Sequence, residues 1–380
     1  MTLTDNAFAV LGARPADDRM TLNEKADEAA LFGGGETEDA LNQLMQLNRR
    51  LSAELAWFPG ASDQAADAFL EYAKALGEGR AAAVPPVEGL GTALAQANGL
   101  AALFEIWPVD DPAMLEALCR ALDSILGQVT AQEAFEAINQ DRRRGGWEPV
   151  PDVMSLVEQL NGRLRELCAP VRKVAERMER KALAGAILKL LAPAGFDAQG
   201  SVAQALLDSY AMRVHEQAEA GKQRLMERIG QLSKADSVSK AQLSEMADLV
   251  NEWCDLTAPL RKIPGSYRDD ARAIGFGMRE VVVNYVNKAG SVKKKQVYTF
   301  RVLNGTRTVT LEYQSQLPYV QEARDRTFWL KSRFFEQVEL VSRLEEDVKM
   351  LNQIEENEKT MLSNAEERAR MQAGPFAKRI

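Results

Sequence analysis

The sequence predicts a mostly α-helical protein with one small three-stranded antiparallel β-meander near its C-terminus. Three observations predict this fold class: long stretches of apolar residues at helical spacing, proline and glycine interruptions between those stretches, and a change of apolar period from about 3.6 residues to about two after residue 279. The chain has 380 residues, of which 46% are hydrophobic and 27% charged. It is therefore long enough for two or three domains with buried cores, and we expect a multi-helix bundle with long helical hairpins.

The N-terminal half divides into two predicted helical segments. Residues 1–60 form a small module with helices over 18–32 and 37–57, because three glycines separate these stretches and Pro59-Gly60 ends the second. Residues 61–150 form a further helical domain. Its predicted breaks are Pro85-Pro86, Trp107-Pro108 and Gly145-Gly146.

A long-helix bundle is predicted over residues 151–278, with helices at 152–191, 199–232 and 240–260. Pro170 interrupts the first of these helices. Because the sequence Pro-Ala-Gly at 193–195 predicts a short turn, we expect the first two helices to pack as an antiparallel hairpin.

Residues 279–316 are predicted to form the β-meander. Three runs of apolar residues alternate with polar ones, and the intervening Lys-Ala-Gly-Ser and Asn-Gly segments are typical hairpin turns. Period-two geometry places Tyr298, Phe300 and Val302 on one face. The alternating residues are Val281, Val283 and Tyr285; Tyr298, Phe300 and Val302; and Val309, Leu311 and Tyr313.

An amphipathic helix is predicted over residues 319–372, where apolar residues recur at steps of three and four among many charged ones. Such a seam should be buried, either on the protein's own helices or on a partner. The seam residues are Phe334, Val338, Val341, Leu344, Val348 and Leu351.

The meander is locally basic in a chain whose net charge is −8. We consider three interpretations of its charged and aromatic residues. Lysines can protect a sheet edge from aggregation while the aromatic rings face the core; they can contact nucleic-acid phosphates while the rings stack on bases; or they can bind an acidic protein surface. The candidate binding residues are Lys293, Lys294, Lys295, Tyr298, Phe300, Arg301 and Arg307.

The sequence offers little for catalysis. His215 is the only histidine, which excludes a zinc site built on paired histidines, and it has no catalytic type of residue beside it. No glycine-rich loop follows a strand in the way that phosphate or dinucleotide binding requires. Paired aspartates at 17–18, 110–111 and 269–270 are typical of helix caps and turns, and Arg142–Arg144 of a solvated helix end. We expect no catalytic residue, no metal and no cofactor.

Three cysteines lie far apart within apolar helical patterns, which favours buried free thiols over a disulfide framework or a zinc site. The N-terminus lacks the charge and apolar pattern of a signal peptide, and no apolar stretch is long enough to span a bilayer. We therefore expect a cytoplasmic protein with no membrane contact.

Residues 6–12 (Asn-Ala-Phe-Ala-Val-Leu-Gly) resemble the opening turn of a J-domain, and residues 47–51 (Leu-Asn-Arg-Arg-Leu) resemble the Asp-Pro-x-x-Arg segment near the end of such domains. The resemblance covers about 55 residues. It implies a DnaK-type chaperone as partner. However, residues 33–35 (Gly-Gly-Gly) stand where that family has the His-Pro-Asp loop that stimulates the chaperone's ATPase. The resemblance thus implies a degenerate module with a docking role alone.

These features together predict a non-catalytic adaptor or assembly subunit of a cytoplasmic complex, with one or more protein partners and a link to chaperones through the J-like module. The alternative function is nucleic-acid binding by the basic meander at 279–313.

Overall fold

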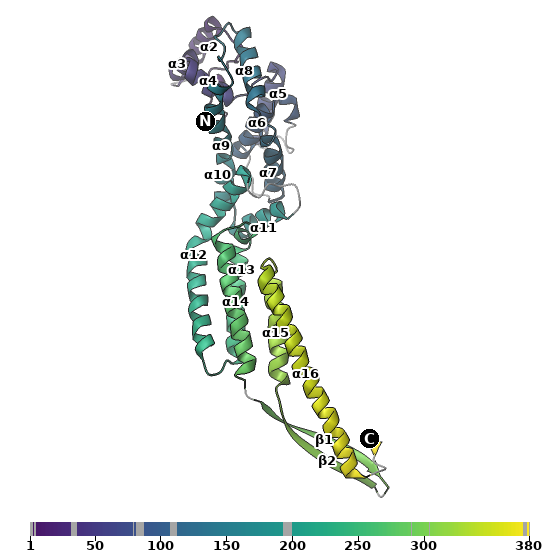
Figure 1. The fold of residues 1–380 in the computed structure, drawn as a ribbon. Helices are drawn as coiled ribbons and strands as arrows, with labels where there is room; N and C mark the ends of the chain where they lie inside the picture. Colours follow the sequence, from purple (N-terminus) through teal and green to yellow (C-terminus); the bar gives the residue numbers. More distant parts are fainter. Residues whose placement is uncertain are drawn as a thin grey trace. The chain divides into compact units, whose positions relative to one another are not determined.

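The computed structural model describes residues 3, 5–31, 36–78, 80, 87–106, 112–192, 200–289, 291–303, 305–374 and 378–379 (Figure 1). The chain divides into two compact units, residues 1–213 and 214–380, and the division falls within the long helix α12.

Unit 1 is built from helices. Most are amphipathic and bury one apolar face, whereas α6 is buried almost all round and forms the centre of the unit. The elements of unit 1 are α1 (Ala7–Val10), α2 (Arg19–Leu31), α3 (Thr37–Met45), α4 (Leu47–Leu55), α5 (Asp63–Gly77), the 3₁₀ helix η1 (Glu88–Leu90), α6 (Ala93–Ile106), α7 (Pro112–Leu126), α8 (Ala131–Arg144), α9 (Met154–Glu166), α10 (Ala169–Arg177), α11 (Arg180–Leu191) and the first part of α12 (Ser201–Lys234).

The first turn of the chain is held by a buried asparagine. The Asn6 side-chain oxygen accepts a hydrogen bond from the Phe8 amide, which caps α1, and the side-chain amide donates to the Ala53 carbonyl near the end of α4. Gly12 follows with a φ of 59°, a conformation that favours glycine. The short helix is therefore tied to a segment some fifty residues away.

Two expectations for unit 1 need correction. The single helix expected over 37–57 is two helices, because the backbone at Gln46 is extended and separates α3 from α4. The helix at 180–191 packs mainly against α7, and the antiparallel hairpin expected with α12 is not the main contact. The interruption at Pro170 is confirmed, since this residue lies in the first turn of α10. Residues 33–35, 85–86, 107–108, 110–111 and 193–195 lie outside the described residues.

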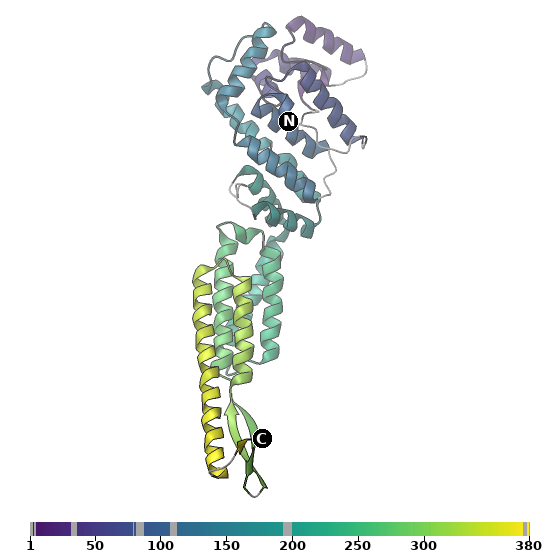
Figure 2. The same cartoon turned by 90° about the vertical axis from the view of Figure 1, so that its right-hand side faces the viewer.

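Unit 2 is a bundle of long helices with a β-hairpin beside the last helix (Figures 1 and 2). Apolar residues from all the bundle helices meet in one core. The elements of unit 2 are the second part of α12, α13 (Lys240–Thr257), the 3₁₀ helix η2 (Leu260–Lys262), α14 (Ser266–Asn287), β1 (Val292–Val302), β2 (Gly305–Ser315), α15 (Leu317–Arg333), α16 (Val338–Ala373) and the two-residue β3 (Lys378–Arg379).

The prediction of a first strand in the three-stranded meander is wrong, because residues 281–285 belong to α14. The buried residues Ile274, Met278, Val281, Val282 and Tyr285 recur at steps of three and four, which is the helical period. The alternation of Val281, Val283 and Tyr285 is therefore a coincidence within a longer helical pattern. Val282 is also apolar and is buried together with Val281, so burial does not alternate from one residue to the next as it would in a strand with one buried face.

The other two strands form a long antiparallel hairpin. They pair from Val292 opposite Ser315 to Val302 opposite Gly305. Tyr298 and Phe300 are buried and Val297 and Arg301 are exposed, so the predicted alternation of faces along β1 is confirmed. At the second edge of β1, β3 pairs antiparallel with Phe300 and Arg301.

The expected helix over 319–372 is also two helices, α15 and α16, which pack antiparallel with a turn at 334–337. Phe334, in this turn, is fully buried. A side-chain carbon added at Gly275 of α14 would meet Leu340 and the Phe334 ring, so the glycine allows their close approach. Burial of one aromatic residue across the bundle accounts for a turn that periodicity did not predict.

Candidate interaction surface

The inner face of the β-hairpin is packed against α16. Tyr298 and Phe300 are 1% and 0% exposed, and they form a small core with Ala369 and Ala373 of that helix. Their rings are stacked with centroids 6.4 Å apart, and the Tyr298 hydroxyl donates to the Leu362 carbonyl over 3.4 Å. These two candidate binding residues are consequently covered, and their rings cannot stack on a base as the hairpin stands.

The hairpin is attached to α16 at both ends. At its base, Glu358 accepts hydrogen bonds from the Ser315 hydroxyl (2.6 Å) and the Gln316 amide (3.1 Å). Near its tip, Arg307 donates to the Gln372 carbonyl over 2.8 Å, so this candidate binding residue has an internal role. Sequence reasoning missed Glu358, since no local pattern signals a contact across 43 residues.

The outer face of the hairpin is open. It carries Lys293, Lys295 and Arg301 on β1, and Val297 lies between them, 58% exposed. Lys295 pairs with Glu312 directly opposite on β2 at 2.6 Å. Lys293 stands opposite Gln314, and no ion pair of Lys293, Lys294 or Arg301 occurs within the described residues. The remaining residues of this face on β2 are Thr306, Thr308 and Thr310.

The predicted helix seam is buried in part. Phe334, Leu344 and Leu351 are buried within unit 2, and Val341 and Val348 are half-buried. Val338 is 78% exposed, so the prediction that it belongs to the buried seam is wrong. The buried stripe of α16 is Leu340, Leu344, Asp347 and Leu351, because the turn at 334–337 changes the phase of the helix relative to the predicted one.

A small apolar pocket of about 110 Å³ lies between α14, α15 and α16. An ion pair is part of its lining, in which Arg279 donates to both carboxylate oxygens of Asp347 over 2.7 and 2.8 Å. Pockets for drug-sized ligands usually exceed about 300 Å³, so this one is too small for such a ligand.

His215 and the three cysteines differ in their exposure to solvent. His215 is exposed, with Nδ1 3.3 Å from the Tyr267 hydroxyl. The three cysteines are buried and free, as predicted, and burial raises the pKa of Cys168 and Cys254 to about 11. Thiols with such pKa values are poor nucleophiles. No cluster of three or more potential metal ligands occurs in the part of the chain that the structure describes.

Unit 1 contains a buried ionic cluster that the sequence did not suggest. Glu54 of α4 accepts hydrogen bonds from Arg50 (2.8 Å) and from Arg142 of α8 (2.9 Å), and all three side chains are buried. Arg50 also donates to the Pro15 carbonyl, and its guanidinium lies 3.8 Å from the centre of the Trp147 ring. Burial is the largest influence on Glu54 and raises its pKa, while Arg142 and Arg50 oppose that rise.

The expectation that Arg142, Arg143 and Arg144 form a solvated helix end is wrong for Arg142 and confirmed for the other two. Arg142 is buried, whereas Arg143 and Arg144 are exposed at the end of α8 as expected of a solvated cap. A triplet of arginines shows no local sign that one of them faces inward. Its partner Glu54 lies 88 residues away in the sequence.

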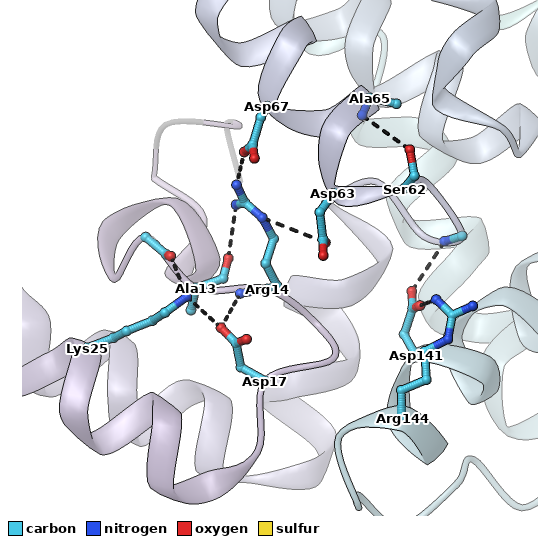
Figure 3. A network of polar contacts seen from close by, with 12 residues as sticks. Ala13, Arg14, Asp17, Lys25, Ser62, Asp63, Ala65, Asp67, Asp141 and Arg144 are labelled. Carbon is cyan, nitrogen blue, oxygen red and sulfur yellow. Dashed lines mark hydrogen bonds and ion pairs between the residues drawn. The ribbon is translucent and has the colours of Figure 1, made fainter.

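The paired aspartates act in turns and caps, as predicted where they are described. Asp18 accepts a hydrogen bond from the Thr21 amide, and Asp17 binds the Arg14 amide and the Lys25 ammonium (Figure 3). In the same region Arg14 reaches Asp67 on α5 (Figure 3). Asp270, by contrast, pairs with Lys222 of α12 at 3.0 Å. Asp17 and Asp270 thus also bind lysines of a neighbouring helix, Lys25 and Lys222.

Comparisons with protein-family models, with curated proteins and with solved structures find no match to this chain. None of the described helices is both long enough and apolar enough to cross a membrane.

Proposed function

We propose that the protein is a non-catalytic adaptor or assembly subunit of a cytoplasmic complex, and that it binds a protein partner through the outer face and free edge of the β1–β2 hairpin. The observation that supports this proposal is the division of the hairpin into two faces. Tyr298 and Phe300 are buried under α16, while Lys293, Lys295 and Arg301 face solvent.

The same division favours a protein over a nucleic acid as the partner. Single-stranded nucleic acids are bound by aromatic rings that stack on bases together with cations that contact phosphates. Here the rings of Tyr298 and Phe300 are covered, and only the cations are available. The exposed lysines of β1, with Val297 and Thr299 further along the same face, instead match cross-strand pairing with acidic and β-branched side chains.

The test is purification of the tagged full-length protein from its native cell after nuclease treatment. We expect specific proteins to co-purify with the wild type and to be lost from a Lys293→Glu/Lys295→Glu variant. A Lys234→Glu/Lys349→Glu variant is the matched control, because it makes the same change of charge at exposed helical positions of unit 2. Equal recovery of partners with all three proteins would refute the hairpin as the binding surface.

Nucleic-acid binding is the alternative function and is tested separately. If phosphate contacts dominate, retention on single-stranded DNA or RNA should fall steeply with salt and should require Lys293 and Lys295. Strong, lysine-dependent retention at physiological salt would favour this alternative over the protein partner.

We further propose that residues 1–60 act as a degenerate J-like docking module. Because residues 33–35 carry no histidine, proline or aspartate, the purified protein should not raise the ATP turnover of a DnaK-type chaperone. A steady-state ATPase assay measures this, with an active J-domain protein as the positive control. Clear stimulation by this chain would contradict the proposed loss of the loop's function.

A further inference from the structure

We infer that the free edge of β1, from Val292 to Tyr298, binds an acidic protein segment that pairs with it as an additional β-strand. This inference rests on the proposed function and names the chemistry of the partner: an extended peptide whose alternate residues are Glu or Asp. The edge, the charges and the chain's own C-terminal strand support it.

The edge is an open hydrogen-bonding surface. Along its whole length β1 pairs with β2 on one side. On the other side, within the described residues, only Phe300 and Arg301 have a strand partner, which is β3. Residues 292–298 therefore present backbone donors and acceptors that an extended peptide can satisfy.

The chain itself shows that this edge accepts a strand. β3 (Lys378–Arg379) pairs antiparallel with Phe300 and Arg301 over the residues that the structure describes there. The edge beside it is basic, with Lys293 and Lys295 on β1. An acidic strand would therefore add attraction between side chains to the backbone pairing.

The hairpin also contains an internal example of the expected side-chain pairing. Lys295 and Glu312 stand directly opposite each other on adjacent strands and form an ion pair. An added strand on the other side of β1 would place its own residues beside Lys293 and Lys295 at about the same spacing, roughly 5 Å between Cβ atoms. Lys293 lacks such a carboxylate neighbour on β2, since Gln314 stands opposite it.

A second copy of the hairpin is a worse occupant. Residues 292–315 carry five basic residues and one acidic residue. Two such hairpins joined edge to edge would bring lysines together, and like charges on neighbouring strands are destabilising. Charge complementarity therefore selects an acidic partner over self-association.

The experiment uses the full chain and a fluorescein-labelled peptide of seven residues that alternates glutamate and valine. Fluorescence anisotropy should show saturable binding by the wild type. The Lys293→Glu/Lys295→Glu variant should bind at least tenfold more weakly, and the Lys234→Glu/Lys349→Glu control within about twofold of the wild type. Circular dichroism checks that both variants remain folded.

Two methylated peptides separate strand pairing from simple charge attraction. In a β-strand the N–H groups of alternate residues point to opposite edges. N-methylation of the valines blocks one edge of the peptide and N-methylation of the glutamates blocks the other, with no change in charge. We expect one methylated peptide to lose at least tenfold in affinity and the other to bind nearly as the parent. Binding by both, or by neither, would overturn the inference.

Hydrogen–deuterium exchange gives a second readout, because the bound peptide should slow exchange of the amides in residues 292–298. A single-stranded oligonucleotide of equal charge should not do so, and equal protection by both would show a site for negative charge alone. If the peptides fail while native partners still depend on Lys293 and Lys295, strand pairing is refuted and the proposed function stands. If native partners ignore these lysines, the proposed function fails independently.

Discussion

Units 1 and 2 use charged side chains in different ways. In unit 1, Arg50, Glu54 and Arg142 lie inside the unit, and Glu54 is 2% exposed. In unit 2 the shared core is apolar, and the ion pair of Arg279 with Asp347 lies at the edge of that core, where the Arg279 side chain remains 28% exposed. The Glu54 cluster of unit 1 therefore joins distant segments through buried ionic hydrogen bonds, whereas the Arg279–Asp347 pair of unit 2 joins two helices at the edge of an apolar core.

The difference has an energetic consequence. A buried ion pair gains little net free energy over an apolar core of the same shape, but removal of one member leaves an unpaired charge in a poorly polarisable site. Removal of one member of a surface ion pair lowers the free energy of unfolding by less, because water solvates the remaining partner. We therefore expect substitutions of charged residues to be severe at the buried Glu54 cluster of unit 1 and milder at the partly exposed Arg279–Asp347 pair of unit 2.

The largest effect is expected for Glu54→Ala. It leaves two buried arginines without their shared carboxylate and should lower the free energy of unfolding of unit 1 by about 4 kcal/mol. Urea titration followed by hydrogen–deuterium exchange of α4 and α8 measures this. Glu116→Ala, which removes a more exposed ion pair with Arg120 in the same unit, is the control and should cost less than about 1 kcal/mol. Similar losses for both variants would remove the contrast between buried and exposed charge.

Next in size is Leu344→Ala in α16. The side chain is fully buried in the apolar core, and its truncation should cost about 3 kcal/mol. Val338→Ala, in the same helix, should change the free energy of unfolding by less than about 0.5 kcal/mol, because Val338 is exposed. Thermal unfolding of both variants tests the corrected stripe. A larger loss for Val338 would restore the predicted seam and imply a partner that covers it.

A smaller effect is expected for Asp347→Ala. It removes both hydrogen bonds from Arg279, but this guanidinium can turn to water, so we expect a loss of about 1.5 kcal/mol. Chemical denaturation of the variant gives the value. A loss as large as that of Glu54→Ala would show that this ion pair is as buried in effect as the cluster of unit 1.

The smallest effect is expected for Lys331→Ala at the surface of the α15–α16 hairpin. The hydrogen bond from Lys331 lowers the pKa of Glu345. A carboxyl whose folded pKa is lowered stabilises the fold above its unfolded pKa, and this contribution disappears as the pH falls through the folded pKa. The melting temperatures of variant and wild type should be nearly equal at pH 7 and should converge in acid. A difference that grows below pH 4 would contradict this.

Much of the helical content follows from local sequence. The starts and ends of α2, α12 and α13 were predicted to within about three residues, because the periodic apolar residues that indicate a helix, and the interruptions between them, are local features of the chain. The two strands of the hairpin were predicted for the same reason, since turn residues and alternation are local.

The sequence predictions were wrong where a contact between residues distant in the sequence determines the local structure. Residues 281–285 alternate like a strand, but packing of α14 against α13 and α15 selects the helical phase. The break between α15 and α16 depends on Phe334 entering the core opposite Gly275. Neither contact is visible from spacing, since each joins residues that are far apart in the sequence.

For the candidate interaction surface, the sequence by itself determined which strand is basic and which of its residues share a face, since strand geometry alternates side chains regardless of what surrounds them. Tertiary structure decided which face is usable. α16 covers Tyr298 and Phe300, and it leaves Lys293 and Lys295 in water. It also decided that Arg142 and Glu54 meet inside unit 1, because the free energy of burying a charge depends on a partner that only folding brings near.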